Sequence, residues 1–342
     1  MDEFTNTYRF LPYIPDFKQH KRDWIDFLYR IVCHHNQDNI TRTIAYQSFY
    51  LLHPEIKWSF LASMVSRNAG WNMTDLEGET FRNLLTSETR KNLFMTYERA
   101  NWSIFQDAFP QLLIYHYSTL YKEEMFHLLK DFQVSSFMQE EWNLFWEHRN
   151  EDRLVQSQII NEQNLIQKPV IDHPVYKKKV FRSGLFFIED HLHFCSVVFP
   201  SQNGELIGAS VHDFRKLDDR IKLGNILYQI LFHNDYYPSF YDFARKVKPT
   251  GSRNDYEGFC ASSLTRTNTP SLTSVYDKVD HHWELEEDWS HHTNVKKAWY
   301  HKPSLPEDPC MTKWFFHKQK QLKKVAWLKS MVIKNKERTA GN

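Results

Sequence analysis

The chain has 342 residues, enough for one large domain or two smaller ones. Its 43 Lys and Arg residues balance 42 Asp and Glu residues, so the overall charge points to no particular class of partner. With nine glycines and 16% aromatic residues, the composition favours packed helices over a sheet with many tight turns. The sequence contains neither GxGxxG nor GxxxxGK(S/T), which excludes the common glycine-rich phosphate-binding loops.

The four cysteines argue against a disulfide framework and against a zinc ribbon. Cys33, Cys195, Cys260 and Cys310 lie far apart in the sequence and form no CxxC pair. We expect them to be free thiols in a reducing compartment. The first residues lack the basic and apolar segments of a signal peptide, and no apolar run is long enough to span a bilayer. The sequence therefore predicts a cytoplasmic protein without a transmembrane segment.

The beginning of the chain is predicted to be helical. Apolar residues recur at helical spacing over residues 15–36, and a second helix is expected over residues 39–52. Pro54 stops that helix and fits the first turn of the next one. Gly70 is expected to close the third helix, because glycine tolerates the left-handed conformation of a C-cap.

Capping signals mark the helices that follow. Thr74 and Glu77 form a capping box, which predicts a short helix ending at Leu85. Ser87 is expected to cap a longer helix that is apolar on more than one face and therefore central and buried. Pro110 is expected to kink or restart this helix. Further helices are predicted over residues 120–132 and 136–168.

After Pro169 the pattern changes to short strands. The runs 193–199 and 206–211 are expected to pair as a β-hairpin across the turn at residues 200–204. The polar segment 249–270 is interpreted as a long loop, and the residues that follow show little periodicity. Helices are predicted over residues 217–232, 239–247 and 311–334.

These elements predict a mainly α fold, a multi-helix orthogonal or bundle-like domain with a small antiparallel β-hairpin. We expect a single helical domain over residues 10–250, with the hairpin at about residues 192–211. A loop-rich tail over residues 251–308 and a basic C-terminal helix over residues 309–336 complete the predicted organisation.

Five segments of the sequence resemble the successive blocks of one protein family. They are NITRTIAYQSFYLLHPEIKWSFLASMVSRNAGWNMTDL, ERANWSIFQDAFPQLLIY, INEQN, GELIGASVHDFRKLDDRIKLGNILY and TGSRNDY. In this order they are similar to the YppC-like domain-of-unknown-function family of Firmicutes, over about residues 35–256. The resemblance implies a bacterial, cytosolic protein of one architecture. That family has no assigned activity, cofactor or catalytic residues, so the resemblance implies no mechanism.

The densest group of polar side chains lies in residues 39–76. The candidate binding residues in this segment are Arg42, Tyr46, His53, Arg67, Asn68, Asn72 and Asp75. Helical spacing places Arg42, Tyr46 and His53 on one face, where the guanidinium of Arg42 would suit a small anionic ligand. The favoured alternative is a structural network that fixes the crossing of two helices. The ion pairs expected in that network involve Arg42, Glu55, Arg67 and Asp75.

Glu162 is the candidate catalytic residue. It lies on a helical stripe with Ile159 and Ile166, and a carboxylate among apolar side chains has a raised pKa unless it is paired. Such a group suits general acid–base chemistry. The favoured alternatives are a carboxylate lifted to solvent or one paired in the core. The candidate partners are Arg42, Arg67 and Arg99.

A weaker candidate is a metal site near the hairpin. His191, His193, His212 and Asp213 have the side chains of a histidine-plus-carboxylate site, and the hairpin would bring them together. The chain has 18 histidines, however, so chance neighbours are expected and no metal is assigned.

The C-terminal segment is strongly basic. Residues 311–338 contain nine basic residues and one acidic residue, with aromatic and aliphatic residues between the lysines. This composition is typical of helices that contact nucleic acid or an anionic membrane. The favoured interpretation is a docking helix that covers the core with its apolar side, including Leu322, Val325, Leu328 and Met331.

The leading functional hypothesis is a cytosolic binding or interaction protein. Its polar groove would be built from residues 39–76 together with the helices over 98–117 and 154–168. The ligand would be a small anion or another protein, and no cofactor is assigned. The alternative is an enzyme, hydrolase-like or metal-dependent, that uses Glu162 or the histidines 191, 193 and 212.

Overall fold

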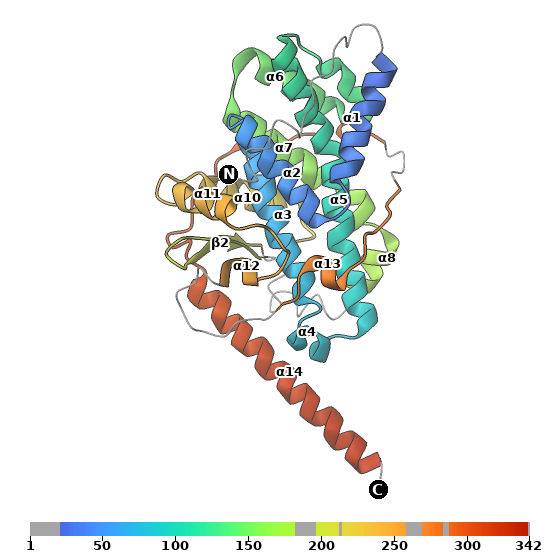
Figure 1. Ribbon diagram of the computed structural model, residues 1–342, viewed down its shortest axis with the longest axis vertical. Coiled ribbons are helices and arrows are strands. Elements are labelled where there is room, and N and C mark those ends of the chain that lie inside the picture. Colours follow the sequence, from blue (N-terminus) through green and yellow to red (C-terminus); the bar gives the residue numbers. More distant parts are fainter. Residues whose placement is uncertain (1–20, 182–195, 212–213, 258–268, 283–286, 341–342) are drawn as a thin grey trace.

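The computed structural model describes residues 21–181, 196–211, 214–257, 269–282 and 287–340. Figure 1 shows a bundle of helices along the long axis of the molecule, with one small hairpin. The helices are α1 (Lys21–His35), α2 (Asn39–Leu52), α3 (Lys57–Asp75), α4 (Glu79–Leu84), α5 (Ser87–Tyr121), α6 (Ser136–His148), α7 (Glu151–Leu165), α8 (Pro174–Tyr176), α10 (Leu217–Leu231), α11 (Tyr237–Lys246), α12 (Asn254–Glu257), α13 (Leu272–Val275) and α14 (Thr312–Ala340). The strands are β1 (Ser196–Pro200) and β2 (Leu206–Ser210). The predicted mainly α fold with a small antiparallel hairpin is confirmed.

The pair α2 and α3 forms the first layer of the bundle. A capping box starts α2, because the Asp38 carboxylate accepts from the backbone N–H of Thr41 and the Thr41 side chain accepts from that of Asp38. The predicted end of α3 at Gly70 is wrong, since this helix continues to Asp75. A Cβ atom on Gly70 would lie 3.0 Å from Nδ2 of Asn39. The glycine therefore permits close approach of the start of α2 rather than ending α3.

Helix α5 is the central helix of the bundle. It runs for 35 residues and passes through Pro110 without a break. The expected restart at this proline is therefore wrong. Leu112, Leu113 and Ile114, which follow it, are completely buried. The packing of these residues explains why the helix persists despite one lost backbone hydrogen bond.

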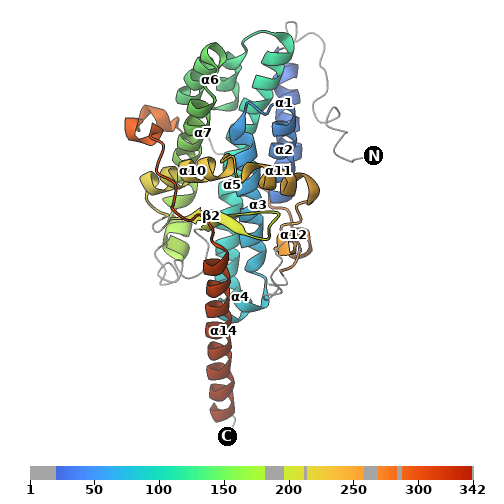
Figure 2. The same ribbon diagram turned by 90° about the vertical axis from the view of Figure 1, so that its left-hand side faces the viewer.

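Helices α10 and α11 cross the long helices of the bundle, as Figure 2 shows. A Cβ atom on Gly224 of α10 would lie 2.6 Å from Cγ2 of Ile159 on α7. The absence of a side chain at residue 224 therefore allows α10 to approach α7 closely.

Strands β1 and β2 pair antiparallel, from Ser196 opposite Ser210 to Pro200 opposite Leu206. The turn ends with Gly204 in the left-handed region, at φ 78°. The hairpin predicted across residues 200–204 is confirmed. Beyond it, the backbone N–H of Gly208 donates to the carbonyl of Pro309, so the segment before α14 lies along β2.

The segment 249–270, interpreted as a long loop, contains a short helix in its described part. Residues 254–257 form α12, and Ser252, Arg253 and Tyr256 are buried. The interpretation as a loop is therefore wrong for the beginning of this segment. Its side chains pack against α3, as described below.

Helix α14 leaves the body of the molecule and ends far from it (Figures 1 and 2). The expected docking helix would bury four apolar residues, but only Leu322 is covered, at 4% exposure. Val325, Leu328 and Met331 are 53%, 48% and 44% exposed. The docking interpretation is therefore wrong for the second half of the helix. None of the described helices is long and apolar enough to cross a membrane.

Candidate functional site

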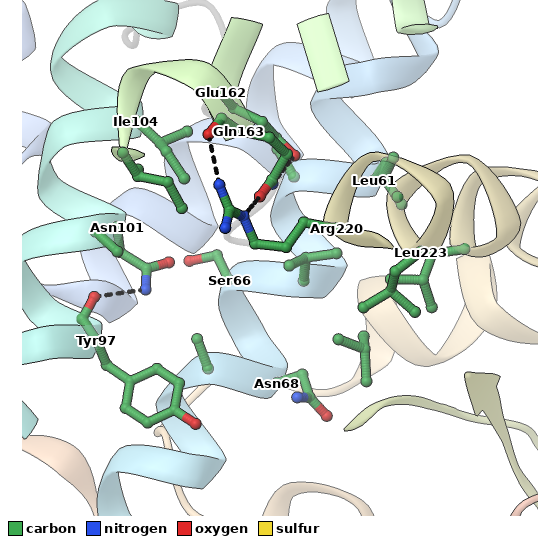
Figure 3. A pocket seen from close by; sticks show the side chains of 18 of the residues that line it. Leu61, Ser66, Asn68, Tyr97, Asn101, Ile104, Glu162, Gln163, Arg220 and Leu223 are labelled. Atoms are coloured by element: carbon green, nitrogen blue, oxygen red, sulfur yellow. Dashed lines mark hydrogen bonds between the residues drawn. The ribbon is translucent and has the colours of Figure 1, made fainter. Parts of the chain in front are cut away.

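A cavity of about 170 Å³ lies between α2, α3, α5, α7 and α10, beside β1, and Figure 3 shows the residues around it. Its apolar lining consists of Leu61, Ala62, Val65, Ala69, Ala100, Ile104, Ile166, Val197, Phe214, Leu223, Gly224 and Leu227. Its polar lining consists of Arg42, Tyr46, Ser66, Asn68, Asn72, Tyr97, Asn101, Glu162, Gln163 and Arg220. An apolar cavity with a few convergent polar groups is the usual form of a small-molecule site.

Glu162 is the acidic residue of the cavity wall. It is half-buried, and its carboxylate accepts a hydrogen bond from Nε2 of Gln163 at 3.0 Å. Within the described part of the chain it forms no ion pair, so the expected pairing with an arginine is wrong. Burial raises the pKa of Glu162 to about 7, and the Gln163 amide and Trp58 indole offset this only in part. A carboxyl group that titrates near neutrality therefore faces the cavity.

Tyr46 lines the same cavity. The residue is buried, with its ring 5.5 Å from that of Trp58 and 5.0 Å from that of Phe105. Its hydroxyl has no hydrogen-bond partner among the described residues. Burial and the charge of Glu162 raise its pKa well above the ordinary value. The hydroxyl is therefore protonated at neutral pH.

Arg42 also reaches the cavity, but its terminal nitrogens are already used. Nη2 lies 2.5 Å from Oε2 of Glu98, and Nη1 donates to Oδ1 of Asn36 at 3.1 Å. Burial alone would raise the pKa of Glu98, but Arg42 and His281 bring it below the usual value. The expected pairing of Arg42 with Asp75 or Glu55 is therefore wrong. Of the Arg42 nitrogens, Nε alone has no partner among the described residues.

Arg220, at the start of α10, adds a buried guanidinium group to the cavity lining, beside Gln163. Nε and Nη2 donate to the side chain and the carbonyl of Gln163, at 2.9 and 3.0 Å (Figure 3). Its remaining N–H groups donate to Gln167 and to the carbonyls of Phe214 and Arg215. All five donors are thus occupied, and Arg220 ties the end of α7 to α10 without a donor left for a ligand.

Asn68 and Asn72 hold neighbouring segments in place. The amide of Asn68 donates to the carbonyl of Ser196 and accepts from the N–H of Val198, both at 3.1 Å. This pair of hydrogen bonds fixes β1 against α3. Oδ1 of Asn72 accepts from Nη2 of Arg253 at 3.0 Å. Both residues line the cavity, yet their polar atoms serve the fold.

Arg67 and Asp75 interact with different partners. Nε of Arg253 lies 2.8 Å from both carboxylate oxygens of Asp75. Arg67 donates to the carbonyl of Val247 and stacks over Phe243 at 4.6 Å. The expected pairing of Arg67 with Asp75 is wrong, because both find partners in the second half of the chain. Neither residue lines the cavity.

His53 lies at the other end of α2, away from the cavity. Its Nδ1 is 3.1 Å from Oε1 of Glu55, and its Nε2 is 2.9 Å from Nδ1 of His116. Tyr115 donates to the same Glu55 oxygen at 2.8 Å. Burial lowers the pKa of His116 to about 4, so its ring is neutral at ordinary pH. This group joins α2, α3 and α5.

The weaker metal candidates, His191, His193, His212 and Asp213, lie outside the described residues. In the part of the chain that is described, no three His, Cys, Asp or Glu side chains converge as a metal-binding group.

Comparison with known proteins places the chain in a family. The family described as protein of unknown function (DUF2515) matches residues 34–318. The chain belongs to the DUF2515 family. It is 48% identical over 288 residues to the uncharacterized protein YppC of Bacillus subtilis (strain 168), a match that covers 84% of this chain and 89% of that protein. No solved structure matches significantly. The resemblance inferred from the five sequence segments is thus confirmed.

Sequence reasoning missed several residues around the cavity of this DUF2515 protein. Tyr97, Asn101 and Ile104 lie at helical spacing on α5, which is a signal that the sequence contains. Arg220 lies within the segment RKLDDRIK, where nothing distinguishes it from an exposed charge. Its burial becomes evident only once α7 and α10 are packed together.

A second carboxyl group, Asp107 on α5, was also missed. Its Oδ2 accepts from Nε2 of Gln111 and from Nδ2 of Asn161, both at 2.7 Å. Oδ1 of Asn161 in turn accepts from Ser135 and Trp289. Burial raises the pKa of Asp107 to about 7. This network belongs to the core of the bundle rather than to the cavity lining.

Proposed function

We propose that this DUF2515 protein binds a small, mainly apolar molecule that carries one hydrogen-bond donor, an amine or a hydroxyl. The observation that carries the proposal is a cavity lined by Glu162 and Tyr46, where, among the described residues, the carboxyl has no cation beside it and the hydroxyl has no hydrogen-bond partner. Buried hydroxyls usually have a partner and desolvated carboxyls usually have a counter-ion, so a cavity lined by Tyr46 and Glu162 favours an occupant that carries a donor.

The size of the cavity limits the occupant. Its volume is about 170 Å³. Since an apolar cavity of about 150 Å³ accommodates benzene, we expect a ligand of roughly six to ten non-hydrogen atoms. The aliphatic side chains of Leu61, Ile104 and Leu223 would contact its apolar part.

The charges around the cavity favour an amine over an anion. The guanidinium of Arg220 has no free N–H, and that of Arg42 is paired with Glu98. A carboxylate ligand would therefore meet Glu162 with few donors to compensate for the repulsion. A protonated amine would form a charge-assisted hydrogen bond with Glu162 and replace the missing cation. The structure thus argues against the anionic ligand expected for this groove.

A matched series of benzene derivatives tests the proposal. Benzylamine, benzyl alcohol, toluene and benzoate have nearly the same shape and differ in the polar group. We expect benzylamine to bind at least about tenfold more tightly than toluene, because a hydrogen bond to a charged group contributes about 1.5–3 kcal/mol. Benzyl alcohol should be intermediate and benzoate should bind most weakly. Isothermal titration calorimetry measures all four.

Three variants make the test specific to the cavity. Glu162→Gln should abolish the preference for benzylamine over toluene, because it removes the charge and keeps the volume. Ala100→Leu should weaken every ligand by filling the space. Glu140→Gln is the matched control, since Glu140 is an exposed residue of α6. Benzoate binding more tightly than benzylamine, or a preference that survives Glu162→Gln, would overturn the proposal.

A second candidate function is acid–base catalysis at Glu162. The favouring observation is its pKa of about 7, at which the carboxyl is both a useful acid and a useful base in neutral solution. Incubating a metabolite extract with the wild-type protein and with Glu162→Gln, followed by mass spectrometry, distinguishes the candidates. Time-dependent consumption of a compound by the wild type alone supports catalysis, and retention of an unchanged compound supports binding.

We also propose a cytoplasmic location. Support comes from Cys33 and Cys310, the described cysteines, which are free thiols as is usual in reducing compartments. Fractionation of cells that express the full chain would test this location.

A further inference from the structure

The second half of α14 carries an unpartnered face with a distinct composition. Lys320, Lys324, Trp327, Leu328 and Met331 are all exposed and follow one another at helical spacing, which places them on one side of the helix. Trp327 is 58% exposed, although tryptophan is usually covered in folded proteins. We call this set the basic–apolar face.

The opposite side of the helix attaches it to the body. Phe315, Gln319, Leu322 and Ala326 recur at the same helical spacing and are buried. Near α4, Nζ of Lys329 donates to the carbonyl of Leu84 at 2.9 Å. One side of α14 is therefore anchored, and the basic–apolar face on the other side is exposed.

The charge of α14 between Thr312 and Met331 is entirely positive. From Thr312 to Met331 the helix contains six lysines and no acidic residue. Among the described residues, none of these lysines forms an ion pair with an Asp or Glu. The excess positive charge is therefore available to an external anionic surface.

We propose that the basic–apolar face binds an anionic lipid surface. In an interfacial helix, apolar side chains enter the acyl boundary while lysines extend their ammonium groups to the lipid phosphates. Tryptophan favours this boundary because its ring is apolar and its N–H is polar. Lys320 and Lys324 lie on the same face as Trp327 and Leu328, one to two turns nearer the start of α14, so both kinds of side chain can meet one lipid surface.

Two other occupants fit less well. A second copy of this chain would bring two sets of six lysines together without an acidic residue to pair with them, and like charges repel. A nucleic acid would satisfy the lysines and could stack on Trp327. It would, however, leave Val325, Leu328 and Met331 in water. A lipid surface matches both the charge and the apolar residues.

Vesicle sedimentation with the full chain tests the proposal. The probes are vesicles of pure phosphatidylcholine and vesicles in which about one third of the lipid is phosphatidylglycerol. We expect binding to the anionic vesicles only, and weaker binding as salt rises from about 0.1 M to about 0.5 M, since salt screens the attraction. Quenching of tryptophan fluorescence by brominated acyl chains should accompany binding.

Two double variants test the apolar residues and the lysines of the basic–apolar face separately. Trp327→Ser with Leu328→Ser removes apolar contact, and Lys320→Glu with Lys324→Glu reverses charge. The glutamate pair should weaken binding at least about 25-fold, since each lysine near an anionic surface contributes about a factor of five. The serine pair should also weaken binding, because it removes two apolar side chains from the acyl boundary. The control, Lys91→Glu with Lys222→Glu, changes as much charge at exposed positions elsewhere and should reduce binding far less. Unchanged circular dichroism verifies folding.

Trp327→Phe adds a direct readout of insertion. The phenylalanine retains apolar contact, so binding should persist while quenching by brominated lipid decreases. Absence of binding to anionic vesicles would overturn the proposal. A dimer that Trp327→Ser and Leu328→Ser dissociate, measured by sedimentation velocity, would instead assign the face to a second copy. Tighter binding to duplex DNA than to anionic vesicles would assign it to nucleic acid.

Discussion

Two carboxyl groups, those of Asp107 and Glu162, have no cation beside them among the described residues, and the pKa of each lies near neutrality. Burial raises the pKa of both Asp107 and Glu162 to about 7. Glu98 shows the contrast, because Arg42 and His281 bring its pKa below the usual value in spite of burial. A buried carboxylate is normally paired, so the unpaired ones identify where the fold departs from the most stable arrangement.

The raised pKa of Asp107 predicts a specific pH dependence. Below about pH 4 both the folded and the unfolded states hold the proton, and between about pH 4 and pH 7 only the folded state keeps it. The contribution of Asp107 to the free energy of unfolding therefore falls as pH rises through this window. Asp107→Asn should become more stable relative to the wild type with increasing pH, by up to about 4 kcal/mol.

Urea unfolding of the wild type and Asp107→Asn, at about pH 5 and about pH 8, measures this difference. At each pH the free energy of unfolding of the wild type must be subtracted from that of Asp107→Asn. His35 and His116, whose pKa values burial lowers to about 4, make both proteins more stable as pH rises, and the subtraction removes this contribution. The asparagine oxygen can still accept from Gln111 and Asn161, so the network is retained. A difference that does not change with pH would mean that Asp107 ionises like an exposed carboxyl.

At the residue scale, helical spacing selected Tyr46, which shares a face with Arg42 and His53, and Glu162, which lies on a stripe with Ile159 and Ile166. Both residues line the cavity. Helical spacing was insufficient for the partners of Arg67 and Asp75. Asp75 pairs with Arg253, which is 178 residues away in the sequence. Spacing along one helix gives no information on such a distant contact. It favours an ion-pair partner that is near in the sequence, such as Glu55, and that prediction is wrong.

At the scale of elements, the end of α3 and the segment 250–256 form one unit. Nε1 of Trp71 donates to Asp255, and the Thr74 hydroxyl donates to the carbonyl of Gly251 at 2.6 Å. Arg253 is buried between Asp75 and the ring of Phe315, 4.9 Å away. This unit explains why two sequence segments that are each rich in polar residues occur in an otherwise apolar core.

Arg253→Ala is expected to loosen this unit. Removing one partner of a buried ion pair typically costs about 3–5 kcal/mol, because the other charge remains buried. Hydrogen exchange should therefore accelerate in the second half of α3 and in residues 250–257, and the free energy of unfolding should fall. Lys248→Ala, at an exposed position nearby, is the control. Equal effects of both variants would show that the ion pair with Asp75 does not stabilise this region.

At the scale of the whole molecule, composition and helical periodicity were sufficient to predict the fold class and the hairpin. They were insufficient for α14, because an amphipathic pattern shows which side is apolar but not whether another surface covers it. The division into a domain over residues 10–250, a tail and a C-terminal helix remains a proposal. We modify it in one respect and propose that the first half of α14 packs as part of the domain, since Phe315 and Leu322 are buried and the backbone N–H of Met311 donates to the carbonyl of Leu206.

Truncation at two positions tests this division of α14. A chain that ends after Ala326 keeps Phe315 and Leu322 and loses most of the exposed apolar residues, so its melting temperature should stay within about 2 °C of that of the full chain. A chain that ends after Asp308 loses both buried residues, each worth about 1.5–3 kcal/mol, and the contact along β2. Its melting temperature should fall by about 5–10 °C, as measured by circular dichroism. If the truncation after Ala326 already lowers the melting temperature by this amount, the exposed residues of α14 are covered in solution. If the truncation after Asp308 leaves the melting temperature unchanged, the entire helix is an appendage to the domain.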